Sequence, residues 1–166
     1  ASTSTIHGSG PLEYLLPKLS TFFKEINTVL FIPYARPGGI SYDEYTEKIS
    51  VPFAKINIKV KGIHEFEKSK EAIQNAEAIF TGGGNTFELV NQLYKNDVLL
   101  TLKNSIKSGT LYLGTSAGSN ICGISMMNTN DMPIVYPPSF KTMGLIPFNI
   151  NAHYLDPIEN STHMGE

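Results

Sequence analysis

The chain has 166 residues, a formal net charge of −2 and a single cysteine, Cys122. Hydrophobic residues make up 41% and charged residues 17% of it, which is the composition of a folded globular domain rather than of a disordered segment. This charge gives no basic surface for nucleic acid or an anionic membrane, and one cysteine excludes an internal disulfide and a cysteine-rich zinc site. We therefore expect one domain over residues 1–166 with a small, peptide-like partner.

The apolar pattern alternates between helices and strands along the chain. Residues 12–23 have helical spacing, and residues 28–34 form a continuous apolar run typical of a strand covered on both faces. Further helices are predicted over 41–56, 65–76, 86–95 and 97–109, and further strands over 56–63, 77–81, 110–114 and 145–154. Strands separated by such helices predict an α/β three-layer sandwich around a mostly parallel sheet, which binds ligands at the carboxyl ends of its strands.

Both ends of the chain lack a closing element. The chain opens on "ASTSTIHGSG" without methionine, like a loop that leaves a strand, and it stops at "STHMGE". We therefore expect the domain to lack its first strand and its C-terminal segment. No apolar run approaches the roughly 18 residues of a membrane span, and no signal peptide opens the chain, so we expect a cytoplasmic protein without a membrane partner.

The segment "GTSAG" (114–118) fits the nucleophile elbow G-x-S-x-G between a predicted strand and a predicted helix. In such an elbow a strained backbone projects the serine hydroxyl, here that of Ser116, and the glycines prevent a collision within the turn. The helix that follows places N–H groups beside a developing oxyanion. The alternative is a small-residue turn that only packs a helix against the sheet.

The segment "TGGGN" (81–85) precedes another helix and allows a close approach of the backbone. It matches neither G-x-G-x-x-G nor G-K-[ST], so a nucleotide site is poorly supported. A better interpretation is an oxyanion hole formed by the N–H groups of Gly84 and Ala117. Asn85 either caps the helix, with Glu88 three residues later, or faces a substrate.

His153 is the preferred base for Ser116, because it ends the predicted strand 145–154 at the same edge of the sheet. A hydrogen-bonded structural histidine is the alternative there. His7 lies in a polar segment, His64 lies between charged residues, and His163 is almost terminal. No pair of histidines has the spacing of metal ligands, so we expect neither a metal nor a cofactor.

Taken together, these segments resemble the peptidase E (aspartyl dipeptidase) family over nearly the whole chain. The resemblance lies in "FIPYA" with "DEYTEK", "TGGGNTFELV", "LYLGTSAGSN", "TNDMPIV", "FNINAHYLDP" and "HMGE", in the family's order. It implies a fold like that of class I glutamine amidotransferases and a serine peptidase that cleaves dipeptides with an N-terminal aspartate. By the same resemblance Ser116 is the nucleophile, His153 the base, and Gly84 and Ala117 the oxyanion hole.

The resemblance also implies groups that this chain does not match. The family's third catalytic residue, a glutamate, and an arginine-bearing segment follow "HMGE", so we name no third catalytic residue. The substrate aspartate needs a cation, preferably a guanidinium. Arg36 is the only arginine here and lies where the resemblance gives none, so we expect the specificity arginine to belong to the absent segment. We further expect Asn85 to bind the substrate aspartate and Asp131 to bind the free α-ammonium group.

Three other functions remain open. In an α/β-hydrolase esterase the acid lies between the serine and the histidine, where Asp131 is the only carboxylate. A cyanophycinase-like hydrolase would cleave aspartate-rich polymers. A small-ligand binding domain would keep the glycine turns without catalysis. The oligomeric state is not set by these patterns.

Overall fold

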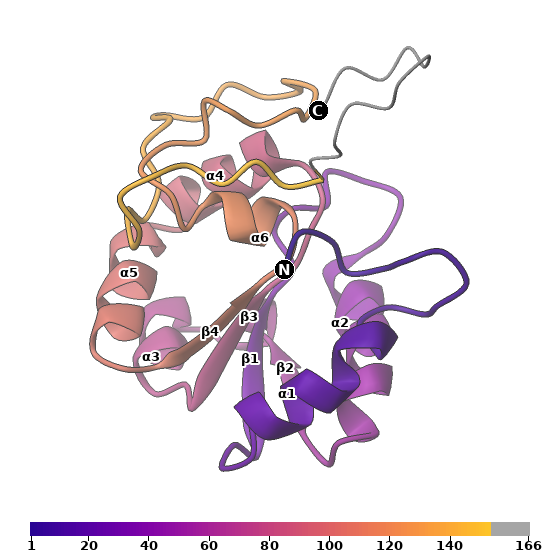
Figure 1. Cartoon of the computed structure of the whole chain (residues 1–166). Helices are drawn as coiled ribbons and strands as arrows, with labels where there is room; N and C mark the ends of the chain where they lie inside the picture. Colours follow the sequence, from indigo (N-terminus) through magenta and orange to yellow (C-terminus); the bar gives the residue numbers. More distant parts are fainter. Residues whose placement is uncertain (154–166) are drawn as a thin grey trace, which may run out of the picture.

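The computed structural model describes residues 1–153, which form a four-stranded parallel sheet with helices on both faces (Figure 1). The strand order is β2-β1-β3-β4, with β1 (Thr28–Ile32), β2 (Lys59–Gly62), β3 (Ala78–Thr81) and β4 (Leu111–Gly114). In the register, Val29 lies opposite Val60 on one side and Ala78 on the other. The prediction of a parallel α/β sandwich is confirmed.

The helices connect successive strands and cover the two faces of the sheet. In chain order they are η1 (Glu13–Leu15), α1 (Leu16–Phe22), α2 (Tyr42–Ala54), η2 (Ile63–Glu65), α3 (Ser69–Gln74), α4 (Thr86–Lys95), α5 (Leu99–Lys107) and α6 (Ala117–Asn120). Figure 1 shows α1 and α2 on one face and α3, α4 and α5 on the other. None of the helices within residues 1–153 has both the length and the apolar character that a bilayer crossing requires.

Two hydrophobic clusters lie on opposite faces of the sheet, because side chains alternate along each strand. In β1, Phe31 joins the cluster with α1 and α2, whereas Leu30 joins the cluster with α3, α4, α5 and α6. The four strand residues that follow Thr28 are all buried. This explains the continuous apolar run in the sequence, since a strand covered on both faces has no polar side.

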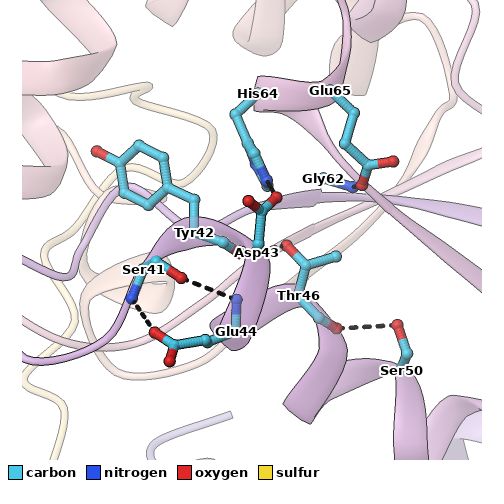
Figure 2. A network of polar contacts seen from close by, with 9 residues as sticks. All are labelled: Ser41, Tyr42, Asp43, Glu44, Thr46, Ser50, Gly62, His64 and Glu65. Carbon is cyan, nitrogen blue, oxygen red and sulfur yellow. Dashed lines mark hydrogen bonds and ion pairs between the residues drawn. The ribbon is translucent and has the colours of Figure 1, made fainter.

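The start of α2 is fixed by a capping box (Figure 2). The Glu44 N–H donates to Ser41 Oγ at 3.1 Å, and the Ser41 N–H donates to Glu44 Oε2 at 2.7 Å. In the same turn, Asp43 Oδ1 lies 2.9 Å from His64 Nε2. That contact connects α2 to η2, which follows β2. His64 is thus bonded to Asp43, whereas Ser116 is bonded by His153.

The predicted strand over 145–154 is wrong over its described part, since residues 145–153 form no strand. Pro147 has no N–H to contribute to a ladder. The polar groups of this segment instead bond to the loop after α6, where the Ser125 N–H donates to Asn149 Oδ1 at 3.0 Å and Asn128 Nδ2 donates to the Ile150 carbonyl at 2.7 Å. His153 therefore reaches the sheet edge on an irregular segment. The last residue of the predicted strand, Tyr154, lies outside the described residues. So do the rest of "YLDP" and the segment "HMGE".

Candidate active site

The two glycine-rich turns meet at the carboxyl edge of the sheet, one after β3 and one after β4. A Cβ atom on Gly118 would lie 2.2 Å from the Thr81 carbonyl oxygen, and one on Gly114 would lie 2.3 Å from the Gly118 carbonyl oxygen. The backbone of α6 thus packs directly against β3 and β4. The glycines of "GTSAG" are required by this packing as well as by the elbow.

Ser116 stands at the corner between β4 and α6 with φ 51° and ψ −113°. A positive φ is uncommon for a residue other than glycine, and it is the backbone strain expected of a nucleophile elbow. A Cβ on Gly83 would lie 3.0 Å from Ser116 Cβ, so the two turns are in contact. Tyr112 Oη supports the turn by donating to the Gly118 carbonyl at 2.8 Å, and burial raises the pKa of Tyr112 well above its usual value.

His153 and Ser116 are brought together by the fold. The distance between His153 Nε2 and Ser116 Oγ is 2.7 Å, which is a hydrogen bond of the length needed between a base and a nucleophile. His153 is exposed and has φ 64°. Its N–H donates to Ser2 Oγ at 2.7 Å, and the Ala152 N–H donates to Asn120 Oδ1 at 3.4 Å. The sequence put these two side chains at one edge, although it gave the wrong element for the histidine.

The two expected oxyanion donors lie on the two turns that meet beside Ser116. Ala117 is the first residue of α6, so its N–H has no acceptor within the helix. Gly84 has φ 144° and packs so closely on the Ala35 carbonyl that a Cβ there would lie 2.2 Å from the oxygen. Within residues 1–153, neither the Gly84 N–H nor the Ala117 N–H donates to a backbone carbonyl outside the regular helices and strands.

Asn85 and Asp131 lie together at the N-terminus of α4. Asn85 Oδ1 accepts from the Glu88 N–H at 3.0 Å as an N-cap, and Asn85 Nδ2 donates to the Met132 carbonyl at 2.7 Å. Asp131 Oδ2 accepts from the Thr86 N–H at 2.7 Å, where a carboxylate is favoured by the helix dipole. Both side chains therefore hold the loop around residue 131 against α4, beside the glycine turn. The hydrogen bonds that Asp131 accepts within the described residues do not include one from His153.

A buried polar network that the sequence analysis missed joins these parts. Asn120 Nδ2 donates to Thr86 Oγ1 at 3.1 Å, and Thr129 Oγ1 lies 3.2 Å from Thr86 Oγ1. Thr129 also donates to Asp131 Oδ2 at 3.0 Å. Asn120 ends α6 and, through Ala152, also holds the segment that carries His153. Its only sequence signal is its place three residues after Ala117, which does not distinguish it from a helix-end asparagine.

The electrostatics of the glycine turn depend on Tyr45, whose Oη donates to the Gly83 carbonyl at 3.1 Å. Burial raises the pKa of Tyr45, and the Arg36 guanidinium over its ring offsets part of that rise. Tyr45 therefore stays a neutral donor to the turn. Among residues 1–153, no group of three or more His, Cys, Asp and Glu side chains is placed to hold a metal ion.

Comparison with known proteins identifies close relatives over the whole chain. The sequence profile of peptidase family S51 matches residues 1–166. The peptidase E of Shewanella amazonensis is 44% identical over 167 residues, which cover 99% of this chain and 69% of that protein. A protein of Drosophila melanogaster named probable alpha-aspartyl dipeptidase is 43% identical over 168 residues, again covering 99% of this chain and 69% of the relative.

Solved structures support the same fold. A crystal structure of a putative peptidase E from Listeria monocytogenes superimposes with a TM-score of 0.69 at 23% identity, covering 81% of this chain and 71% of that one. A peptidase from an acI-B1 actinobacterium superimposes with a TM-score of 0.59 at 19% identity, covering 84% and 63% of the two chains. At these identities the likeness concerns the fold alone, and it agrees with the expected amidotransferase-like sandwich.

Proposed function

The chain belongs to peptidase family S51, and we propose that this serine dipeptidase hydrolyses dipeptides with an N-terminal aspartate through an acyl-enzyme on Ser116. The observation that carries the mechanism is the 2.7 Å contact between His153 Nε2 and Ser116 Oγ at a strained strand-to-helix corner. The aspartate specificity is supported by the name of the Drosophila relative, alpha-aspartyl dipeptidase.

These positions support the following reaction. His153 Nε2 accepts the Ser116 proton as Oγ attacks the peptide carbonyl, and the proton then goes to the leaving amine as the C–N bond breaks. A water molecule next attacks the acyl-enzyme, His153 accepts its proton and returns it to Ser116 Oγ as the acid leaves. In both tetrahedral intermediates the oxyanion accepts from the N–H groups of Gly84 and Ala117, each contributing about 3–4 kcal/mol to the lowering of the barrier.

Two polar side chains at the N-terminus of α4 are proposed to bind the substrate's N-terminal residue. Within residues 1–153, both side-chain hydrogen bonds of Asp131 end on Oδ2, so Oδ1 is left to accept from an α-ammonium group. Asn85 Nδ2 has two hydrogens, and one of them bonds the Met132 carbonyl. The other is left for the substrate aspartate.

A fluorophosphonate probe and three peptides test the proposal together. We expect the probe to add one adduct to the protein, with no adduct on Ser116→Ala and an unchanged adduct on the exposed control Ser108→Ala. The protein should cleave Asp-Leu, and cleave neither its β-linked isomer nor acetyl-Asp-Leu. An unlabelled protein without turnover would instead indicate a binding domain, and equal cleavage of acetyl-Asp-Leu would contradict recognition of the free amino group.

A further inference from the structure

A cavity of about 330 Å³ lies at the same edge of the sheet as Ser116, between the start of the chain, the loop after β1 and the first half of α2. Its lining combines two cationic side chains with hydroxyl groups and exposed backbone, namely Arg36 and Lys48, Ser4 and Thr5, and Gly38 and Gly39. No acidic side chain of the described residues lines it. The cavity therefore has the donors of an anion site.

Neither cation is used by an ion pair within residues 1–153. The Arg36 guanidinium lies over the Tyr45 ring with its Cζ 4.8 Å from the ring centroid. A carboxylate can still bind this guanidinium, because it has five N–H donors and its stacking on the Tyr45 ring and hydrogen bond to the Tyr45 hydroxyl do not use them all. Lys48 follows Tyr45 by three residues, so both side chains lie on the same face of α2.

Contacts from two directions place this cavity near the catalytic pair. The Ser116 N–H donates to the Ala1 carbonyl at 3.2 Å, and Ser4 of the same segment lines the cavity. Three residue steps span at most about 11 Å. From the other side, Tyr45 lines the cavity and bonds the carbonyl of Gly83, the residue in contact with Ser116.

Ser116 attacks the middle of a dipeptide, so each carboxylate lies away from the attacked carbon by about half of the roughly 7 Å span of two extended residues, plus its own terminal or side-chain bonds. The long side chains of Arg36 and Lys48 cover the remaining distance from the cavity. A dipeptide with an N-terminal aspartate carries two carboxylates, one on the aspartate side chain and one at its C-terminus. We propose that Arg36, together with Lys48, binds one of these two carboxylates. This inference rests on the proposed dipeptidase activity.

Kinetics with three substrates test the inference and separate the two carboxylates. The variants are Arg36→Gln and Lys48→Gln, with the exposed Lys18→Gln on α1 as a control for lost charge. We expect Arg36→Gln to raise KM for Asp-Leu about tenfold or more, since a hydrogen bond to a charged group is lost. Lys48→Gln should change KM in the same direction by less, and Lys18→Gln should leave it unchanged.

The substrates Asp-Leu-amide and Asn-Leu then identify the bound group. If Arg36 binds the C-terminal carboxylate, Arg36→Gln and the unmodified protein will cleave Asp-Leu-amide with the same kcat/KM. If it binds the aspartate side chain, the two proteins will be equal on Asn-Leu and unequal on Asp-Leu-amide. An equal loss on all three substrates, or no loss on any, would overturn the inference.

A binding measurement keeps this test independent of catalysis. Titration of Asp-Leu into Ser116→Ala, with and without Arg36→Gln, should give a dissociation constant about tenfold larger in the double variant. Equal constants would overturn the role of Arg36 even if the enzyme proves inactive on Asp-Leu. Failure of the unmodified protein to cleave Asp-Leu, with binding still dependent on Arg36, would instead count against the proposed reaction alone.

Discussion

Asn120 is the residue that links the helix after Ser116 to the segment that carries His153. It ends α6, it donates to Thr86 Oγ1, and it accepts from the Ala152 N–H next to His153. Because Asn120 is buried, loss of its amide leaves partners without hydrogen bonds. We therefore expect Asn120 to position the segment of His153 rather than to take part in the chemistry.

The variant Asn120→Ala should lower both stability and turnover. We expect a loss of about 1–3 kcal/mol in the free energy of unfolding, measured with urea. The displacement of His153 should lower kcat about tenfold or more with little change in KM. The exposed Asn104→Ala on α5 should stay within about 0.5 kcal/mol in stability. A normal kcat in a destabilised Asn120→Ala would show that the network serves the fold alone.

Cys122 is a poor nucleophile despite its place near the site. Burial raises the pKa of its thiol to about 11 from 9.0. At pH 8 its thiolate fraction in the folded protein is therefore about 100-fold below that of the unfolded chain. Alkylation by iodoacetamide, followed by intact mass, should be slower in buffer than in urea by about that factor.

The same pKa shift fixes the sign of a pH effect. A raised thiol pKa favours the folded state below pH 9, and this contribution is lost as the pH rises from about 9 to 11. In Cys122→Ala, the free energy of unfolding should therefore fall less between about pH 9 and 11 than in the unmodified protein. An unchanged pH profile in Cys122→Ala would contradict the shift.

Local sequence predicted that Ser116 and His153 lie together, but it predicted less of the groups around them. The motif around Ser116 predicts a strained backbone at that residue. His153 is predicted to lie near it because ligands bind at the carboxyl edge of a parallel sheet. Asn85 forms the predicted cap of α4. It can also bind a substrate only if its second amide hydrogen faces the substrate. Asn120 and Tyr45 have no such motif, because Thr86 and Gly83, to which they donate, lie more than 30 residues away in sequence.

At the scale of elements, α2 shows how local chemistry sets a boundary. The capping box of Ser41 and Glu44 satisfies two backbone N–H groups at its start (Figure 2). We expect Ser41→Ala to lower the free energy of unfolding by about 1 kcal/mol in urea. Ser50→Ala, which removes only a bond to the Thr46 carbonyl inside the same helix, should cost less. Equal losses would mean that the cap does not set the start of α2.

The elements that the sequence predicted well are those with long periodic patterns. Helix α4 has the predicted bounds, and α2, α5 and strands β1 to β4 fall within their predicted ranges with ends shortened by one to a few residues. The strand predicted over 145–154 was wrong over residues 145–153, because the polar residues of this part bond to the loop after α6. An alternation of apolar and polar residues does not show whether a neighbouring strand is available for pairing.

For the whole molecule, the strand order places β1 and β3 inside the sheet and β2 and β4 at its sides within the described residues. The last four residues of β1 and all of β3 are buried, whereas β2 and β4 are mostly half-buried or exposed. Amide hydrogens of β1 and β3 should therefore exchange at least about tenfold more slowly than those of β2. Mass-spectrometric hydrogen exchange on the native protein checks this, and a faster β1 would contradict the sheet order.

The backbone of Ser116 also has a consequence for evolution. A non-glycine residue at φ 51° costs on the order of 1–3 kcal/mol, and glycine relieves that strain for about 0.4–1 kcal/mol of chain entropy. An inactive Ser116→Gly protein should therefore melt about 2–4 °C above an equally inactive Ser116→Ala protein. Selection for thermal robustness alone would favour glycine at this corner, so we expect the serine to exchange stability for turnover.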